Sequence, residues 1–200
     1  MYKTISNEII RKFNPCYDPS KYITDENEEL PIKDWVQKYR KVVPAKDILW
    51  LLLKDEFLSE KDLILFAVWC AREALKLVEN PDHKSIEACD VAERYANGEA
   101  TQEELLAARV AAYPAVDIDP YTVAYAVYYA AYYAASTARA ASYFAARVSA
   151  YASDAAYITA YIAAATAARD TVSRASVDAS DAARAATHAS QIDQLLTYFE

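Results

Sequence analysis

The last eighty residues of this chain, from Tyr121 to Glu200, contain no glycine and no proline. Residues 121–190 hold 28 alanines and 10 tyrosines, and the only glycine of the whole sequence is Gly98. Alanine is the best helix former, whereas glycine and proline are the residues that most readily end a helix. This stretch is therefore predicted to be almost entirely α-helical.

Shorter helices are predicted before this stretch. Hydrophobic periodicity and turn residues place them near residues 7–13, 32–41, 44–57, 59–79, 85–97 and 101–113. No run alternates between apolar and polar residues for long enough to form a strand, so we expect no sheet. The expected fold class is all-α: a helical bundle of about six to nine helices with a long Ala/Tyr-rich C-terminal helical region.

The domain organisation follows from a change in composition near the start. Polar residues 24–29 and Pro31 interrupt the first segment, which holds only short apolar runs. We expect an N-terminal arm with short helices over residues 1–43 and a single all-α domain over residues 44–200. Within that domain, residues 44–113 form one group of helices and residues 120–200 form the Ala/Tyr-rich group.

Capping residues mark the expected helix starts. Ser59, Ser85 and Asp119 each precede a helical pattern, and their side-chain oxygens can accept a hydrogen bond from the first free backbone N–H groups. Thr101 and Glu104 have the spacing of a capping box, in which each side chain bonds the backbone N–H of the other residue.

The sequence marks fewer helix ends and breaks than helix starts. Gly98 follows Asn97 at the position where a left-handed residue commonly ends a helix. Ser153–Asp154 and Asp170–Thr171 are the expected breaks in the last eighty residues, because one unbroken helix would be about 120 Å long. We therefore expect the Ala/Tyr-rich region to fold back into a compact bundle and not to form a rod.

The charge balance limits the classes of partner. The chain carries a net charge of −8 with a pI near 4.9, and the imbalance lies in the first 120 residues, which hold 16 basic and 23 acidic side chains. An acidic surface disfavours binding to the backbone of DNA or RNA. We expect no such binding.

The sequence contains few signals that indicate a cellular compartment. The first fifteen residues lack the apolar run of a signal peptide, and the three cysteines have no metal-binding spacing, which favours free thiols in the cytoplasm. If a phage encodes the chain, the expected location is the cytoplasm of the host cell. Residues 120–138 are uncharged, but their alanines and tyrosines make a poor membrane span, so we expect no membrane association.

One face of the helix that begins at Pro120 gathers tyrosine and arginine. Projected at 100° per residue, the helix places most of its tyrosines on one arc, into which its two arginines also point. We call this set the Tyr/Arg arc. Its candidate binding residues are Tyr121, Tyr125, Tyr128, Tyr132, Arg139, Tyr143, Arg147 and Tyr151. The opposite face, which includes Val148 and Ala152, is small and uncharged and is suited to close helix packing.

Three interpretations of the Tyr/Arg arc remain open. The rings can be ordinary core with their hydroxyls at its edge, a contact face for a protein or a second copy, or a pocket that stacks a small ligand of the nucleotide type. Arg139 and Arg147 favour a contact surface, because a buried guanidinium needs an anionic partner.

A second predicted helical stretch places charged side chains and alanines on opposite sides. Asp178, Asp181, Arg184 and His188 project to one side, which we expect to be a solvated face, while Ala179, Ala182 and Ala186 project to the other. The sequence holds no glycine-rich loop, metalloprotease motif or nucleophile elbow. We therefore expect no enzyme activity, no catalytic residues, no cofactor and no metal.

The middle of the chain is similar to a known family. The segments LILFAVWCAREALKLVENP (63–81) and IEACDVAERYANGEAT (86–101), followed by EELLAARVAAY, resemble alanine-rich immunity proteins of phages and bacteria over roughly residues 44–113. The resemblance implies a cytoplasmic all-α protein that acts by binding, and it implies no catalytic residues. Relatives place tryptophan or other residues where this chain has tyrosine.

The expected function is non-enzymatic. The chain would neutralise a toxin or a host defence factor by stoichiometric binding through the Tyr/Arg arc. An acidic surface would suit a basic toxin through electrostatic steering. One alternative is that a Tyr/Arg pocket sequesters a small nucleotide-type ligand. A second alternative is a structural or self-assembling helical protein.

Overall fold

The structure is a computed structural model, and it describes residues 1–112, 141–167 and 174–199. Within these ranges the chain forms eight α-helices, two short 3₁₀ turns and one pair of three-residue strands. The predicted all-α class is confirmed. The helices are α1 (Asn7–Lys12), α2 (Ile32–Tyr39), α3 (Ala45–Leu52), α4 (Glu60–Leu75), α5 (His83–Ala96), α6 (Gln102–Ala112), α8 (Ala141–Ala167) and α9 (Arg174–Leu195).

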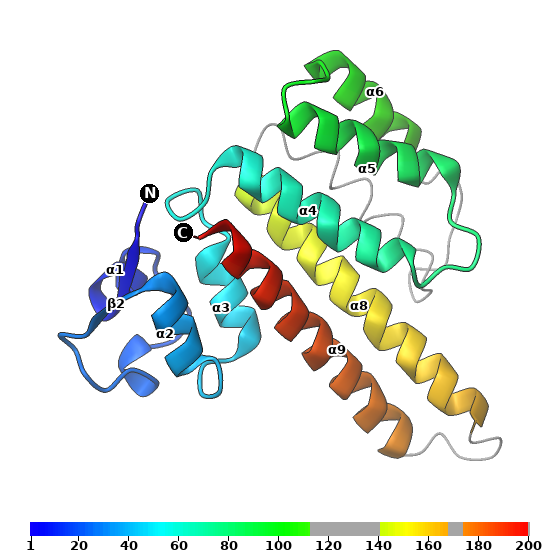
Figure 1. The fold of residues 1–200 in the computed structure, drawn as a ribbon. Coiled ribbons are helices and arrows are strands. Elements are labelled where there is room, and N and C mark those ends of the chain that lie inside the picture. Colours follow the sequence, from blue (N-terminus) through cyan, green and yellow to red (C-terminus); the bar gives the residue numbers. More distant parts are fainter. Residues whose placement is uncertain (113–140, 168–173, 200) are drawn as a thin grey trace.

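The described helices form layers around α4 (Figure 1). Helices α5 and α6 stack on one side of α4, while α8 and the antiparallel α9 lie on the other. Helix α3 packs against α9 and joins the bundle to the first segment of the chain. The long C-terminal helices therefore fold back on each other, as the expected bundle requires.

The first segment contains a small sheet that the sequence did not predict. Strands β1 (Thr4–Ser6) and β2 (Glu29–Pro31) pair antiparallel, with Ile5 opposite Leu30. The prediction of no sheet was wrong here, because three residues are too few to show a period of two. Burial of Ile5 fixes the pairing, and the Thr4 hydroxyl donates to the Glu29 carboxylate across it.

Two of the predicted helix starts have the expected capping bonds. The Ser59 hydroxyl accepts from the backbone N–H of Asp62 at 3.1 Å. In the capping box, the Thr101 N–H donates to Glu104 at 2.7 Å, and the Glu104 N–H donates to the Thr101 hydroxyl at 3.2 Å. These caps are local in sequence, and both predictions are confirmed.

Helix α5 begins earlier than predicted. Its N-cap is Asp82, whose carboxylate accepts from the N–H of Ser85 at 3.3 Å, so Ser85 lies inside the first turn and is buried. A carboxylate at the N-terminus also gains from the helix dipole, which explains why Asp82 takes the position expected for Ser85.

The end of helix α5 matches the prediction. Gly98 has φ 77°, and the following N–H of Glu99 donates to the carbonyl of Arg94 at 2.8 Å. This is the Schellman pattern, in which glycine supplies the left-handed residue.

Helix α4 is the central buried helix, because its sequence is apolar on nearly all sides. Leu63 and Phe66 are fully buried, and Phe66 stacks on Trp69 with ring centroids 6.4 Å apart. Trp69 itself is only half-buried, because its ring lies at the edge of the bundle. The large side chains of α2 and α3 complete this core, with Trp35 only 1% exposed.

Ion pairs join neighbouring helices. Arg72 on α4 pairs with Asp90 and Glu93 on α5, at 2.9 and 2.6 Å, and Arg94 on α5 pairs with Glu104 on α6 at 3.2 Å. Arg72 and Glu93 belong to the two segments that carry the resemblance. The two segments are therefore in contact in the fold.

Helix α8 is continuous through Ser153 and Asp154, so the predicted break there was wrong. The Ser153 hydroxyl donates to the carbonyl of Ser149 at 2.9 Å, one turn earlier, which is how serine is accommodated inside a helix. The predicted break at Asp170–Thr171 and the predicted cap at Asp119 lie outside the described residues. Helix α8 ends at Ala167 and α9 begins at Arg174.

The small-residue face of α8 packs inward, as expected. Val148 and Ala152 are buried in the interface with α4 and α9. None of the described helices is long and apolar enough to cross a membrane.

The two sides of α9 differ from the prediction. Asp178 and Asp181 are exposed as expected, but Arg184 and His188 are half-buried, and Ala182 is exposed on the outer side. Ala179 and Ala186 are exposed with it. Polar side chains, and not alanines, turn inward here because they meet polar groups of α8, as described below.

Candidate functional site

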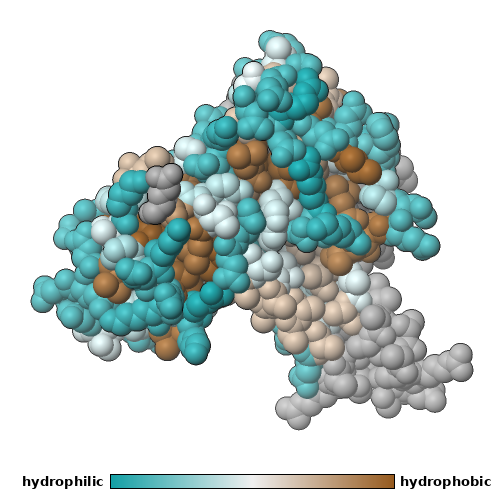
Figure 2. Space-filling view, in the orientation of Figure 1, coloured by the Kyte–Doolittle hydropathy of each residue, from teal (hydrophilic) through white to brown (hydrophobic). Residues whose placement is uncertain are grey.

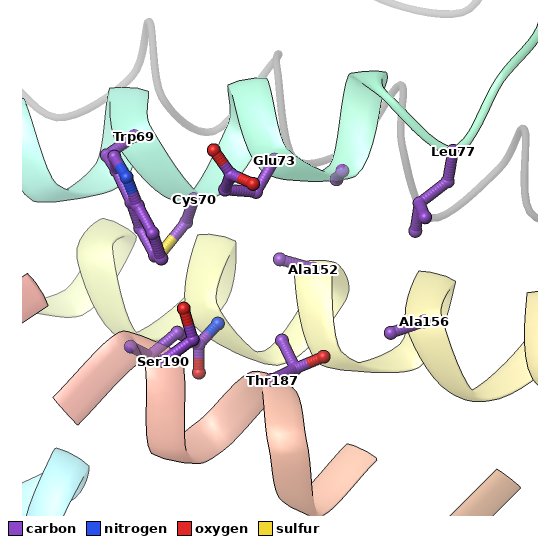
Figure 3. Close-up of a pocket in the computed structure, with 10 residues that line it drawn as sticks. Trp69, Cys70, Glu73, Leu77, Ala152, Ala156, Thr187 and Ser190 are labelled. Atoms are coloured by element: carbon purple, nitrogen blue, oxygen red, sulfur yellow. The ribbon is translucent and has the colours of Figure 1, made fainter. Parts of the chain in front are cut away.

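A pocket of about 160 Å³ lies where α4, α8 and α9 meet (Figure 3). Ala152 and Ala156 of α8 form its floor. These two alanines lie one helical turn apart on the same face of α8. Over that length the face therefore carries only short side chains. Its lining residues are Trp69, Cys70, Glu73, Ala74, Leu77, Ala152, Ala156, Thr187, Ser190 and Gln191.

We call this pocket the groove. Helix α4 supplies one of its walls. Trp69, Glu73 and Leu77 follow one another at a spacing of four residues, which brings them to the same face of the chain as it leaves α4. Figure 3 shows Trp69 and Leu77 at opposite ends, with Glu73 between them. An aromatic ring, a carboxylate and an aliphatic side chain therefore border the opening in that order.

Helix α9 supplies the other wall. Thr187 donates its hydroxyl proton to the carbonyl of Ala183 at 3.0 Å, so the lone pairs of its oxygen remain available to an incoming donor. Ser190 is exposed at the rim. This wall therefore offers hydrogen-bond acceptors opposite the carboxylate of Glu73.

A closed polar network lies beneath the groove. Gln191 is 1% exposed. Its amide oxygen accepts from the Ser149 hydroxyl at 3.0 Å, and its amide nitrogen donates to the Ser149 carbonyl at 3.0 Å. The Ser153 hydroxyl lies 3.4 Å from the same amide oxygen. The same side chain lowers the pKa of the Cys70 thiol, so the amide that ties α8 to α9 also acts on α4.

The buried thiols are unsuited to nucleophilic chemistry. Burial raises the pKa of Cys70 well above its usual range, and the Gln191 side chain only partly opposes this change. Burial also raises the pKa of Cys89 to about 12. Both therefore stay protonated near neutral pH, and a thiol without its thiolate is a poor nucleophile.

Among the lining residues that the structure describes, Glu73 is the only charged one. It pairs with Lys76, the residue that follows the last residue of α4, and the side chain of Lys76 is 67% exposed. An exposed pair of this kind contributes little to stability, so Lys76 holds Glu73 only weakly.

A second polar cluster joins α8 and α9. The guanidinium of Arg184 pairs with Asp154 at 2.9 Å and lies 4.2 Å from the ring centre of Tyr157. Burial lowers the pKa of the neighbouring His188, Arg184 lowers it further, and Asp154 opposes the change. His188 is therefore mostly neutral near pH 7.

Only two residues of the Tyr/Arg arc have side chains that the structure describes. Arg147 donates to the Tyr151 hydroxyl at 3.3 Å, and its guanidinium lies 5.5 Å from the centre of that ring. Both are half-buried. The remaining six fall outside the described side chains: Tyr121, Tyr125, Tyr128, Tyr132, Arg139 and Tyr143. The role of the arc stays a prediction.

The groove was not predicted from the sequence, and neither Trp69, Glu73 nor Gln191 was among the candidate binding residues. The spacing of Trp69, Glu73 and Leu77 was visible in the sequence. The alanine floor, however, comes from a helix far along the chain, and nothing local indicated where that helix would pack.

A larger cavity of about 410 Å³ lies near the small sheet. Aromatic rings, including Tyr2, Phe57 and Tyr198, line it together with Lys3 and Lys33. Two carboxylates, Asp34 and Asp62, share the lining, so the charges there are mixed.

No family model, no curated protein and no solved structure matches this chain. The resemblance to immunity proteins therefore stays a prediction. Among the residues that the structure describes, no three histidine, cysteine or acidic side chains form a group that could hold a metal ion.

Proposed function

We propose that this chain is a non-enzymatic binding protein, and that the groove between α4, α8 and α9 is one of its contact surfaces. In this proposal it neutralises a toxin or a host defence factor by stoichiometric binding. The observation that carries the proposal is a half-buried tryptophan beside an open pocket with an alanine floor.

The size of the groove favours a protein partner. Pockets for small molecules usually have volumes of about 300–1,000 Å³, whereas a cavity of about 150 Å³ accepts one benzene ring. The groove has about 160 Å³. It suits a single inserted side chain.

The composition of the groove supports the same conclusion. Tryptophan is among the residues that contribute most to protein interfaces, and such anchors lie beside well-packed pockets. Trp69 is held in place by its stack on Phe66. A side chain that is already fixed loses little conformational entropy on binding.

The charge of the chain points to a basic partner. A net charge of −8 attracts positively charged proteins and raises their association rate. The resemblance to immunity proteins supports a toxin or a defence factor as that partner. The Tyr/Arg arc remains a proposed second contact surface.

Filling the groove tests the proposal. We expect Ala156→Trp to occupy the groove with its own ring and to abolish binding of the partner that the unmodified protein retains. Ala182→Trp is the matched control, because Ala182 is exposed on the outer side of α9. Native mass spectrometry of protein purified from its own producing cells reports the partner and its stoichiometry. Equal retention by both variants would contradict the proposal.

The second cavity favours a second candidate function, the binding of a small ligand. Its volume of about 410 Å³ lies within the small-molecule range, and rings and lysines can contact a nucleotide-type anion. The same native mass spectra test it. A retained small molecule that is lost in Phe57→Ala but kept in Ala156→Trp would favour this function.

A further inference from the structure

We propose that the groove receives an arginine side chain of the partner and that Lys76 competes with this arginine for Glu73. This inference rests on the proposed function and specifies the chemistry of the partner at the same site.

Charge complementarity supports a cation. Among the lining residues that the structure describes, Glu73 is the only charged one and none is basic. Glu73 already pairs with a cation, Lys76, which is exposed and lies outside the described lining of the groove. A partner side chain that enters the groove with its own cation would compete with Lys76 for the Glu73 carboxylate.

The hydrogen-bonding groups support the same occupant. The Glu73 carboxylate and the Thr187 oxygen are acceptors on opposite walls. The Gln191 amide oxygen accepts from Ser149, and one N–H of the same amide donates to the Ser149 carbonyl. Glu73 and Thr187 therefore present acceptors to a ligand that carries donors.

Shape selects arginine over lysine. The guanidinium is planar, carries five N–H donors and stacks on aromatic rings, whereas an ammonium group is a compact point charge. The ring of Trp69 stands at one end of the groove and Glu73 follows it (Figure 3). A guanidinium can lie on that ring and donate to the carboxylate, while the aliphatic stem covers the alanine floor.

Short peptides of identical sequence test the occupant. The probes are acetylated and amidated pentapeptides with arginine, lysine or citrulline between glycines. Citrulline keeps the shape of arginine but has no charge. Each is titrated into the full chain while the indole N–H signals are followed by NMR. The chain has three tryptophans, and Trp69→Phe identifies the signal at the groove. Trp35 and Trp50, which do not line the groove, serve as internal references.

We expect the arginine peptide to shift the Trp69 signal, with a dissociation constant about fivefold lower than that of the lysine peptide. Citrulline should give no saturable shift. Citrulline binding as tightly as arginine would overturn the inference, because recognition would then not depend on charge.

Three variants examine the competition. Glu73→Gln should weaken arginine binding about fivefold, since a charge-assisted bond becomes a neutral one. Lys76→Met keeps the aliphatic stem but removes the competing charge, so it should tighten binding about twofold. Glu87→Gln removes one exposed acidic group on α5 and should leave the affinity unchanged. Unchanged affinity in both Glu73→Gln and Lys76→Met would overturn the inference.

The inference and the proposed function can fail separately. If Ala156→Trp loses the partner but the arginine peptide does not bind, the groove is a contact surface with a different occupant. If the unmodified protein is an oligomer that Ala156→Trp converts to a monomer, the occupant is a second copy of this chain. Both results overturn the arginine inference.

Discussion

The first part of the chain, through α4, and the helix pair α8–α9 are stabilised in different ways. Most of the largest fully buried side chains that the structure describes, such as Trp35 and Phe66, precede residue 76. In the described part of α8, the buried side chains are no larger than valine, and Ser149 and Ser153 are among them. The first region depends on bulky apolar groups, whereas the second combines close packing with buried hydrogen bonds.

This difference indicates where a binding site can form. Large interlocking side chains fill the space between α2, α3 and α4, while an alanine floor leaves room beside Trp69. Alanine lets helices approach closely, but where the facing side chains stand apart it also leaves a hollow. The groove is therefore a result of how the second region packs.

Removing a large core side chain should produce the greatest loss. Phe66 is 0% exposed, and Phe66→Ala should lower the free energy of unfolding by about 3–5 kcal/mol. Trp69→Ala, although it removes a larger ring, should cost less because Trp69 is half-buried. Urea denaturation followed by circular dichroism measures both. A greater loss in Trp69→Ala would place the core of this region at the groove.

Removing the buried amide should have an intermediate effect. Gln191→Ala leaves the Ser149 hydroxyl without its partner and should cost about 1–3 kcal/mol. The triple variant Gln191→Leu, Ser149→Ala and Ser153→Ala removes both sides of the network and should recover part of this loss. No recovery in the triple variant would mean that packing, and not hydrogen bonding, is what Gln191 supplies.

Removing the half-exposed guanidinium should have a smaller effect. The side chains of Arg184 and Asp154 are 39% and 50% exposed, so their pairing is weakened by solvent. Arg184→Ala should cost about 0.5–1 kcal/mol, much of it from the lost stack on Tyr157. Arg184→Lys should recover little, because an ammonium group stacks poorly. A cost that disappears at high salt would assign the effect to the ion pair instead of the stack.

The smallest expected effect is a dependence on pH. The folded state lowers the pKa of His188, mainly by burial, so the unfolded state binds a proton first. The neutral ring's contribution to stability is therefore present above about pH 6.5 and is lost as the pH falls through the folded pKa. His188→Gln should lose less stability than the unmodified chain between pH 7.5 and 5.5. Equal losses in urea titrations at the two pH values would contradict this.

Local features of the fold were predictable from the sequence. Ser59, Gly98 and the pair Thr101–Glu104 act through bonds to residues within a few positions, so their spacing carries the information. Asp82 was missed because it lies near a second capping candidate, Ser85, and sequence alone did not rank the two. The strand pairing of Ile5 with Leu30 was missed because it joins distant residues.

The site was less predictable for the same physical reason. The break expected at Ser153 is absent because its hydroxyl bonds within the helix and lies near Gln191, a distant residue. The groove needs α4, α8 and α9 at a particular register. Helical projection describes one helix at a time, so it could identify the Tyr/Arg arc but not a pocket shared by three helices.

The buried amide of Gln191 also favours a single alignment of α9 along α8. The inner face of α8 repeats small side chains at every turn, so this face alone would do little to stop α9 from sliding along it by one turn. The same slide would bring Thr187 or Leu195 to the position of Gln191, and neither can make its set of bonds. A single polar residue thus removes a translational ambiguity that a repetitive sequence would otherwise allow. Because the groove exists only at that alignment, the residue that selects the alignment also selects the site.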